Sequence, residues 1–317
     1  MSGKVTTRRI TADEAGIAKV VRMLEDGGLV ALPTETVYGL AARADDAAAV
    51  ARIFAAKGRP SFNPLIVHVA GLEQAERLVE FSDAAYALAE AFWPGPLTLV
   101  LPKRADAGMA EAVTAGLSTI ALRMPAHPVM RAVLKQSGLP LAAPSANRSG
   151  MVSPTSAAHV LQSLEGRIDA VLDAGPSEQG LESTIVAVRA NGRIEELRPG
   201  PLDLFGFTEK LRGATSREDA GQQSIEAPGQ LTSHYAPGKP LRLNADAPRE
   251  DEFFIAFGSS QGDCTLSPGG SLTEAAANLY ACLHTAAASN RPRIAVAPVP
   301  EHGIGRAIND RLRRAAS

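Results

Sequence analysis

Three polar stretches decide the fold of this chain: Pro33-Thr-Glu-Thr-Val-Tyr-Gly-Leu40, Lys57-Gly-Arg-Pro60 running into Asn63-Pro-Leu-Ile-Val-His68, and Ala143-Pro-Ser-Ala-Asn147. The first two lie around what reads as one strand-helix-strand unit, and the third adds a Ser-x-Asn pair. A polar group is costly to bury without a partner, so apolar strands seldom carry this many. We therefore expect the three stretches to line a cavity for a charged ligand.

Apolar spacing predicts the elements around these stretches. A helix over residues 14–26 stops at Gly27-Gly28, a buried strand covers 29–32, and a helix capped by Asp45-Asp46 ends at Gly58. Further strands are expected over 65–69, 97–101, 119–124, 139–143, 170–173, 184–189 and 194–198, with helices over 72–78, 84–92 and 153–164. This order is too irregular for a simple doubly wound sheet and predicts a mixed α/β domain.

A change of composition divides the chain. Residues 211–239 are rich in Gly, Ser, Thr, Gln, Glu and Pro, which is typical of a linker. Strands over 253–257 and 294–298, a helix over 272–288 with the capping signature Ser271 and Glu274, and a last helix over 307–315 follow it. We expect a main domain over residues 1–210, a linker over 211–239 and a small α/β domain over 240–317.

The composition excludes some classes of protein. The chain has 317 residues, of which 45% are hydrophobic and 21% charged, as in ordinary globular proteins. Its net charge of -2 gives no overall attraction to nucleic acid or to an anionic membrane. With no signal-like N-terminus and no long apolar run, we expect a cytoplasmic protein without a membrane span. Cys264 and Cys282 lack CxxC spacing and are expected to be two reduced thiols.

Arg123 is the most informative single residue. Alternation along the strand puts Thr119, Ala121 and Arg123 on one face. An arginine that ends an apolar strand needs an anion if it is buried. A structural Asp or Glu is one possible partner, and the alignment with Thr119 favours a ligand carboxylate or phosphate instead.

The second stretch contains two more cations and a histidine. Lys57 and Arg59 flank Gly58 at a helix end, where cations complement the helix dipole. Pro60 stiffens the segment, so both donors can be held near one polyanion. His68 shares a strand face with Ile66, and a satisfied core histidine is the alternative to a ligand contact.

The third stretch supplies short polar side chains. Alternation points Ser145 and Asn147 the same way, although a capped turn would also explain them. No Gly-x-Ser-x-Gly elbow surrounds Ser145, which argues against a hydrolase nucleophile. Ser183-Thr184 and Arg198-Pro-Gly are weak signals individually, and Gly303-Ile-Gly305 reads as a turn.

The joint presence of PTETVYGL, KGRP with NPL, APSAN, STIV and RPG, in this order, resembles the threonylcarbamoyl-AMP synthases. The resemblance is to the two-domain members, which have a YrdC-like catalytic domain and a smaller C-terminal domain. It extends to Gly229-Gln-Leu-Thr-Ser-His-Tyr-Ala-Pro237 and Ile308-Asn-Asp-Arg-Leu312. It implies a twisted mixed sheet around a deep basic cavity, followed by a small Rossmann-like α/β domain.

The resemblance also implies a reaction. L-threonine, bicarbonate or CO2, and ATP would give threonylcarbamoyl-adenylate and pyrophosphate, with Mg²⁺ held mainly by the ATP phosphates and water. The adenylate would pass to the tRNA threonylcarbamoyl transferase machinery, which modifies the adenosine beside the anticodon.

The implied site has two subsites. Arg123 would pair with the threonine carboxylate, while His68 or a hydroxyl reads the threonine side chain. The implied threonine subsite comprises Thr34, Thr36, Tyr38, His68, Arg123, Ser145 and Ser183. The implied ATP subsite comprises Lys57, Arg59, Asn63, Thr119, Asn147, Ser153, Thr155, Arg198 and the linker residue Tyr235. Among these, Lys57 and Arg59 are the expected catalytic cations, and Tyr235 is expected to act as a lid that excludes water from the adenylate.

Two other functions compete with this one. An RNA-binding module would share the basic concave surface of YrdC-like domains, but the acidic balance and 4% aromatic residues argue against it. A carbamoyl-transfer YrdC-like domain from another pathway, hydrogenase maturation, is the second alternative. The chain lacks the acylphosphatase-like segment and paired CxxC zinc motifs expected there.

Overall fold

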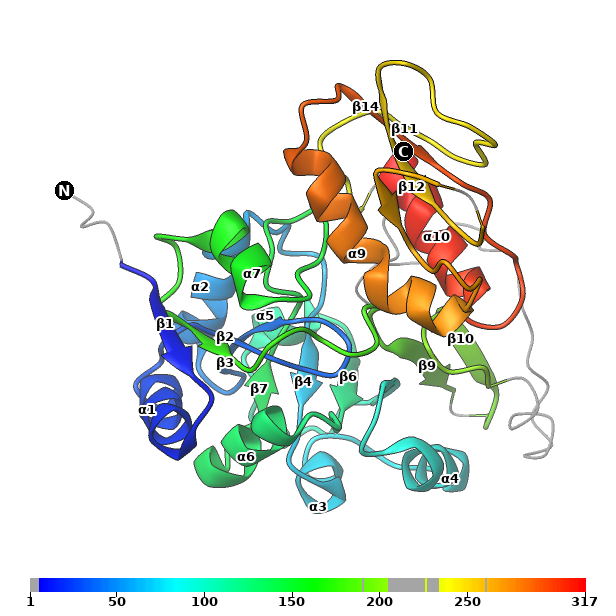
Figure 1. The fold of residues 1–317 in the computed structure, drawn as a ribbon. Coiled ribbons are helices and arrows are strands. Elements are labelled where there is room, and N and C mark those ends of the chain that lie inside the picture. The colour runs from blue at the N-terminus through cyan, green and yellow to red at the C-terminus, as the bar shows by residue number, and fades with distance from the viewer. Residues whose placement is uncertain (1–5, 190, 205–225, 227–233, 260) are drawn as a thin grey trace.

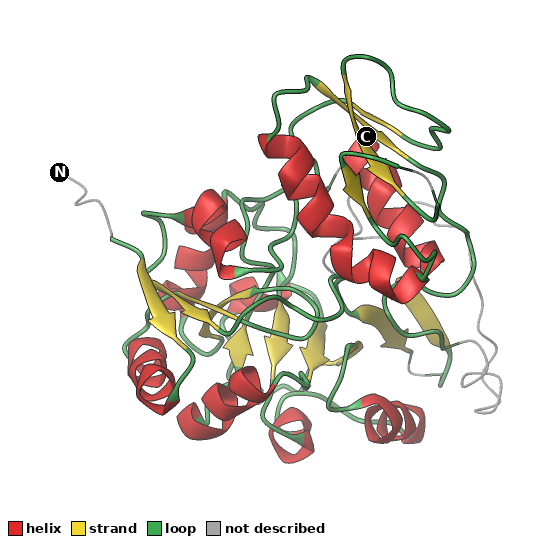
Figure 2. Ribbon diagram, in the orientation of Figure 1, coloured by secondary structure: helices red, strands yellow, loops and turns green. Residues whose placement is uncertain are grey.

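The structure is a computed structural model that describes residues 6–189, 191–204, 226, 234–259 and 261–317. Within these residues the chain forms a large mixed sheet and a small parallel sheet, which lie side by side with their helices (Figures 1 and 2). The large sheet has the strand order β1-β8-β2-β3-β7-β4-β6-β5-β9-β10, and the small one β11-β14-β12-β13. The predicted mixed α/β architecture with a second, smaller α/β unit is confirmed.

The main part of the chain runs from β1 to β10. Its elements are β1 (Arg8–Thr11), α1 (Glu14–Glu25), β2 (Val30–Leu32), β3 (Gly39–Arg43), α2 (Ala47–Lys57), β4 (Ile66–His68), α3 (Leu72–Glu76), α4 (Asp83–Phe92), β5 (Leu97–Pro102), α5 (Glu111–Thr114), β6 (Thr119–Arg123), α6 (Pro128–Ser137), β7 (Leu141–Ala142), α7 (Ala157–Leu164), β8 (Ala170–Asp173), β9 (Thr184–Val188) and β10 (Ile194–Arg198).

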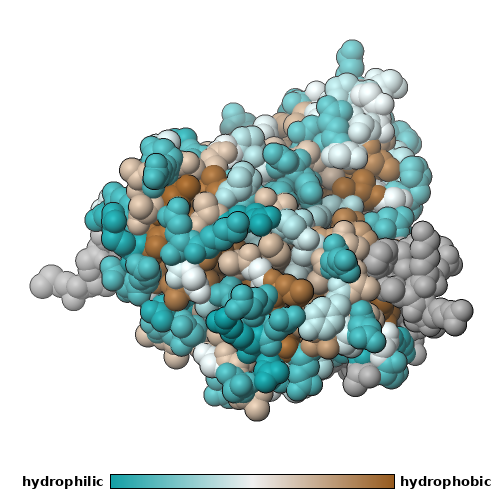
Figure 3. All heavy atoms as spheres, turned by 90° about the horizontal axis from the view of Figure 1, so that it is seen from below, coloured by the Kyte–Doolittle hydropathy of each residue, from teal (hydrophilic) through white to brown (hydrophobic). Residues whose placement is uncertain are grey.

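Helices lie on both sides of the large sheet. Helices α1, α3, α4 and α6 run along one side of it, and α2, α5 and α7 lie on the other (Figure 1). The view from below shows a largely hydrophilic outer surface with scattered apolar areas (Figure 3). The sheet's apolar side chains are therefore buried beneath amphipathic helices, as in other layered α/β proteins.

Local signals set the ends of α2, which carries Lys57. The Asp46 carboxylate accepts hydrogen bonds from the backbone N–H groups of Ala48 and Ala49, so it caps the first turn. Gly58 ends the helix in the left-handed conformation, with a φ of 61° that suits glycine. Lys57 lies in the last turn, as the sequence predicted, and the backbone reverses toward Arg59.

The register of the central strands brings two polar residues together. Strands β4 and β6 run parallel, and His68 is the register partner of Arg123. Both side chains are almost completely buried, at 3% and 4% exposure. The polar groups expected at the pocket thus end two adjacent strands in the middle of the sheet.

The C-terminal unit contains β11 (Leu241–Arg242), β12 (Glu252–Ala256), β13 (Cys264–Thr265), α9 (Leu272–Ala288), β14 (Arg293–Val296) and α10 (Gly305–Ala316). Cys264 and Cys282 form a disulfide between β13 and α9, so the expectation of two reduced thiols is wrong. The two residues are 18 positions apart in sequence but their Cα atoms lie 5.9 Å apart. Their separation in the sequence gave no sign of this packing.

Other differences concern short elements. The helix predicted over 153–164 begins only at Ala157, because Ser156 is extended and caps it, and Ser153 lies in the loop before it. Strands β1, β3, β11 and β13 and helices α5 and α6 were not predicted. The expected linker over 211–239 falls mostly outside the described residues. Within the part of the chain that is described, no helix is long and apolar enough to cross a membrane.

Candidate active site

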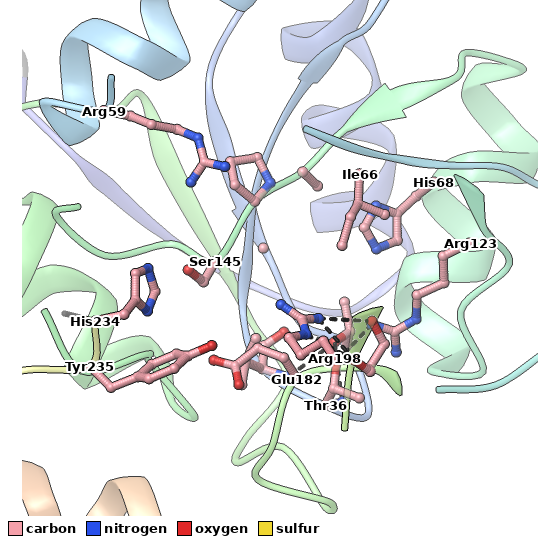
Figure 4. Close-up of a pocket in the computed structure, with 16 residues that line it drawn as sticks. Thr36, Arg59, Ile66, His68, Arg123, Ser145, Glu182, Arg198, His234 and Tyr235 are labelled. Atoms are coloured by element: carbon pink, nitrogen blue, oxygen red, sulfur yellow. Dashed lines mark hydrogen bonds between the residues drawn. The ribbon is translucent and has the colours of Figure 1, made fainter. Parts of the chain in front are cut away.

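One pocket collects most of the polar residues that the sequence singled out. It is a partly open hollow with about 550 Å³ of space between its lining atoms, open solvent included. Figure 4 shows His68 and Arg123 on one side of it, His234 and Tyr235 on the other, and Ser145 between them. The lining residues are Thr34, Thr36, Val37, Gly39, Arg59, Ile66, His68, Arg123, Ala143, Pro144, Ser145, Glu182, Ser183, Arg198, His234 and Tyr235.

Arg123 forms one end of the pocket and pairs with Glu35, which lies outside the lining. Its guanidinium donates hydrogen bonds to the Glu35 carboxylate at 2.5 Å, to the Thr36 hydroxyl at 2.8 Å and to the Gly95 carbonyl at 3.1 Å. Burial alone would raise the pKa of Glu35, but the charge and hydrogen bond of Arg123 bring it below its ordinary value. Arg123 therefore has a structural carboxylate partner, one of the two possibilities that the sequence left open.

His68 lies beside Arg123 as a neutral ring. Burial, together with the positive charge of Arg123, lowers the pKa of His68 to about 3. Its Nδ1 atom is buried and has no hydrogen-bond partner among the described residues. A neutral imidazole with one nitrogen left without a partner can donate a hydrogen bond to a ligand hydroxyl or accept one from it, and it adds no charge.

Arg59 and Arg198 supply positive charge to the other wall. Arg59 donates to the backbone carbonyls of Asn63 and Pro64 and to the Asn63 side chain, at 2.6 to 3.1 Å. Arg198 donates to the Ser183 carbonyl and hydroxyl. Burial, followed by the charge of Arg198, lowers the pKa of Arg59 only to about 10, so the side chain stays protonated at neutral pH. Two buried guanidinium groups make this wall suitable for a polyanion.

Lys57 does not line the pocket. Its ammonium donates to the backbone carbonyls of Ser145 at 2.6 Å and of Asn147 at 2.5 Å. Burial, then the charge of Arg59, holds the pKa of Lys57 well below its ordinary value. In this arrangement Lys57 fixes the turn that presents Ser145 to the pocket.

The structure divides the sequence-predicted residues into two groups. The pocket brings together Thr34, Thr36, Arg59, His68, Arg123, Ser145, Ser183, Arg198 and Tyr235. The remaining predicted residues lie outside its lining: Tyr38, Lys57, Asn63, Thr119, Asn147, Ser153 and Thr155.

Several residues outside the lining support the residues that form it. Asn63 holds Arg59, and the Tyr38 hydroxyl donates to the Gly175 carbonyl at 2.7 Å. Ser153 donates to the Glu182 carboxylate at 2.6 Å. Thr119 begins β6, at the opposite end of the strand from Arg123. These four side chains act on the site through other residues or lie away from it.

Sequence reasoning missed three acidic or basic residues of the site. Glu35 stands inside the first quoted stretch, and His234 precedes Tyr235 in the quoted linker segment. Glu182 lies two residues before the buried strand that begins at Thr184, and a charged residue at that place was a usable signal. Glu182 is the carboxylate among the described lining residues. No cluster of three or more His, Cys, Asp or Glu side chains suited to a metal ion occurs among the described residues.

The fold and the pocket define a class: an α/β protein with a buried, cation-rich site whose hydrogen-bond donors suit anionic small molecules. The comparisons with known proteins narrow this class. Residues 22–200 match the family model described as "Telomere recombination", which groups Sua5, YciO and YrdC proteins. Residues 193–317 match the model described as "Threonylcarbamoyl-AMP synthase, C-terminal domain".

Curated relatives and a solved structure agree with these matches. The chain is 38% identical over 333 residues to a threonylcarbamoyl-AMP synthase of Bacillus subtilis, covering 98% of this chain and 95% of the relative. It is 40% identical over 316 residues to one of Pyrococcus abyssi, covering 92% of each. The crystal structure of P. abyssi Sua5 complexed with L-threonine superposes with a TM-score of 0.86 at 37% identity, covering 98% of this chain and 97% of that one. The chain belongs to the threonylcarbamoyl-AMP synthase family, in its two-domain form.

Proposed function

We propose that this protein condenses L-threonine, bicarbonate or CO2, and ATP to threonylcarbamoyl-adenylate and pyrophosphate. One observation carries the proposal beyond family membership: guanidinium groups stand at both ends of a single pocket. Arg123 with the neutral His68 suits an amino acid that has a carboxylate and a hydroxyl. Arg59 and Arg198 suit a triphosphate.

The threonine end is proposed to work through the sheet residues. Among the described residues, three of the five N–H groups of Arg123 have partners, so two remain for a carboxylate. His68 would read the threonine hydroxyl, and Thr34, Thr36, Ser145 and Ser183 would complete the wall. Tyr38, which the resemblance also assigns here, would act indirectly, since its hydroxyl is bound to Gly175.

The nucleotide end is proposed to include Arg59, Arg198 and Tyr235 as direct contacts. Supporting roles fall to Lys57 and Asn147, whose turn carries Ser145, and to Asn63, which orients Arg59. Thr119, Ser153 and Thr155 complete the residues that the resemblance assigns to this end. ATP would enter as its Mg²⁺ complex, with the ion held mainly by phosphates and water.

The proposed chemistry needs positioning more than a protein nucleophile. The neutral threonine amine attacks the carbon of CO2 to give a carbamate, and the amine loses a proton. A carbamate oxygen then attacks the α-phosphorus of ATP, and the bond to the leaving pyrophosphate breaks. Buried cations stabilise the charge that develops on the phosphates, and a dry pocket limits hydrolysis of the adenylate. Tyr235 is proposed as the lid over that pocket.

The wider assignment is also part of the proposal. The domain boundaries are proposed as a YrdC-like domain over 1–210, a linker over 211–239 and a C-terminal domain over 240–317. We propose that the adenylate passes to a tRNA threonylcarbamoyl transferase in the cytoplasm. A reconstitution with that transferase and tRNA tests the transfer, and cell fractionation tests the location.

Pyrophosphate release from ATP tests the reaction itself. Release is expected only when threonine and bicarbonate are both present, and the nucleotide product should be threonylcarbamoyl-adenylate by mass spectrometry. Release with either substrate alone would contradict the proposal. Salt-sensitive RNA binding without threonine-dependent turnover would favour the RNA-binding alternative.

A further inference from the structure

We propose that Arg311, in the C-terminal domain, is a positioning residue for the nucleotide end of the pocket. The inference rests on the proposed function and assigns the C-terminal domain a part in it. Arg311 lies on α10, outside the pocket lining, and acts through Glu182, Pro199 and Tyr235.

Arg311 donates two hydrogen bonds to residues that are sequence neighbours of two site residues. Its Nε donates to the Glu182 carboxylate at 2.9 Å, and one terminal nitrogen donates to the Pro199 carbonyl at 3.0 Å. Glu182 directly precedes Ser183, and Pro199 directly follows Arg198. Since Arg198 itself donates to Ser183, this single side chain holds both partners of that contact in place.

Arg311 also holds the ring of Tyr235. The guanidinium carbon lies 5.3 Å from the ring centroid, within the range of a cation–π interaction. Tyr280 of α9 stacks on the same ring, with centroids 5.7 Å apart. The Tyr235 hydroxyl is buried at the pocket and has no hydrogen-bond partner among the described residues. Its ring is thus held by Arg311 and Tyr280 of the C-terminal domain. Its hydroxyl faces the pocket (Figure 4) and can bind a ligand.

The charge of Glu182 explains why the contacts of Arg311 should affect ATP binding in particular. Its carboxylate accepts hydrogen bonds from the Ser153 hydroxyl, the Tyr280 hydroxyl and Arg311, and it lines the pocket. Burial alone would raise the pKa of Glu182, but Arg311 and Arg198 bring it to about 2, so the group is an anion. Without Arg311, a weakly compensated buried anion would face the triphosphate and repel it.

Most of the proposed threonine end has no such dependence, since Ser183 is its one residue that directly follows Glu182. Arg123 and His68 stand on strands of the large sheet, and the partners of Arg123 are Glu35, Thr36 and Gly95. A change at Arg311 should therefore alter the two substrates unequally. A general structural defect would alter them together.

The test compares Arg311→Met with Arg313→Met in the full-length protein. Arg313 lies on the same helix, is 57% exposed and pairs only with Glu301 among the described residues, so it is a matched control. Arg311→Met should raise the KM for ATP at least about tenfold, a difference of about 1.4 kcal/mol. The Kd for threonine, measured by calorimetry without ATP, should stay within about twofold. Arg313→Met should resemble the wild type in both.

A rescue experiment separates charge from packing. If the bare Glu182 anion repels ATP, Glu182→Gln added to Arg311→Met should recover part of the lost ATP affinity. Tyr280→Phe removes one hydrogen-bond donor to the Glu182 carboxylate and changes no charge. We expect the KM for ATP to rise about threefold. This milder variant decides the matter if Arg311→Met does not fold.

The outcomes distinguish the two proposals. Equal changes in ATP and threonine affinity, or none in a folded Arg311→Met protein, would overturn the positioning role. If Arg311→Met does not fold, an unchanged KM for ATP in Tyr280→Phe would do the same. A wild-type protein without threonine-dependent pyrophosphate release would instead overturn the proposed function.

Discussion

Two buried Arg–Glu pairs flank the pocket, and they are built differently. Arg123 and Glu35 both belong to the part of the chain that forms the large sheet, and their side chains are 4% and 5% exposed. In the second pair Glu182 belongs to that part, but Arg311 comes from the last helix of the C-terminal unit. Both arginines need their carboxylates, because an unpaired buried charge is costly.

The difference shows how one pocket can have a preassembled end and an assembled end. The strands that carry His68 and Arg123 are fixed by sheet pairing, so these two residues of the proposed threonine end are placed by the large sheet alone. The proposed nucleotide end is completed by α9 and α10, since Tyr235 and Glu182 contact Tyr280 and Arg311 there. The C-terminal unit is therefore expected to affect ATP more than threonine.

Breaking the first pair should have the largest effect. Arg123→Met leaves Glu35 buried without its cation, which should lower the free energy of unfolding by about 3–5 kcal/mol. Loss of the carboxylate contact should also reduce kcat/KM for threonine at least about 100-fold. Chemical denaturation and pyrophosphate release measure the two effects.

Arg104→Met is the control for this prediction. Arg104 is 44% exposed and pairs with the exposed Asp106, so its loss should change stability by less than about 1 kcal/mol. If the folded Arg123→Met protein retained its threonine affinity, Arg123 would be a purely structural partner of Glu35. The two ends would then not differ in the way proposed.

Much of the preassembled end could be predicted from the sequence. The apolar strand before Pro125 put Arg123 at the end of a buried strand, and the Gly58 stop put Lys57 in a last helical turn, both as found. These features follow from local rules of period and capping. The periodicity of a strand does not predict which distant residue its side chains contact. The partner of Arg123 was therefore left open.

The assembled end was harder to predict for a physical reason. Glu182 and Arg311 are 129 positions apart, and the interaction depends on how two separately patterned units dock. The same holds for Lys57, whose ammonium was expected to face phosphate but binds carbonyls 88 and 90 positions away. Nothing in the local pattern distinguishes a lysine that lines a pocket from one that supports its wall.

The disulfide offers a second way to test the comparison. Cys264 ties β13 to α9 through Cys282, two residues from Tyr280, which contacts Glu182. In the loop-entropy account, a bond closing a loop of this order contributes about 3 kcal/mol to stability. Cys264→Ser or reduction should therefore lower the unfolding free energy of the C-terminal unit by about that amount.

Loss of the disulfide should affect the affinity for ATP and leave the affinity for threonine unchanged. Loosening α9 should raise the KM for ATP by a few-fold and leave the Kd for threonine unchanged, as measured by turnover and calorimetry with and without reductant. Cys264→Ser is its own control for the reductant, since it should no longer respond. An equal loss of affinity for both substrates would mean that the two ends are not independent.

The smallest expected effect concerns pH at the interface between α7 and α9. The rings of His159 and His284 stack there, with centroids 3.9 Å apart. Burial, followed by the charge of His284, lowers the pKa of His159 to about 4, and burial lowers that of His284. The unfolded chain takes up these protons near pH 6.5, so stability is complete above that pH and is lost as pH falls toward about 4.

Denaturation curves across this range should show the loss. His284→Gln should make the decline between about pH 6.5 and 4 less steep, whereas the exposed His302→Gln should not change it. The buried His68 and His234 also resist protonation, but they are present in both variants, so the difference isolates the stacked pair. The effect should be smaller than that of the disulfide, because both stacked rings are partly exposed and solvent screens their charge. If His284→Gln followed the wild-type curve, the stacked rings would not contribute to the pH dependence of stability.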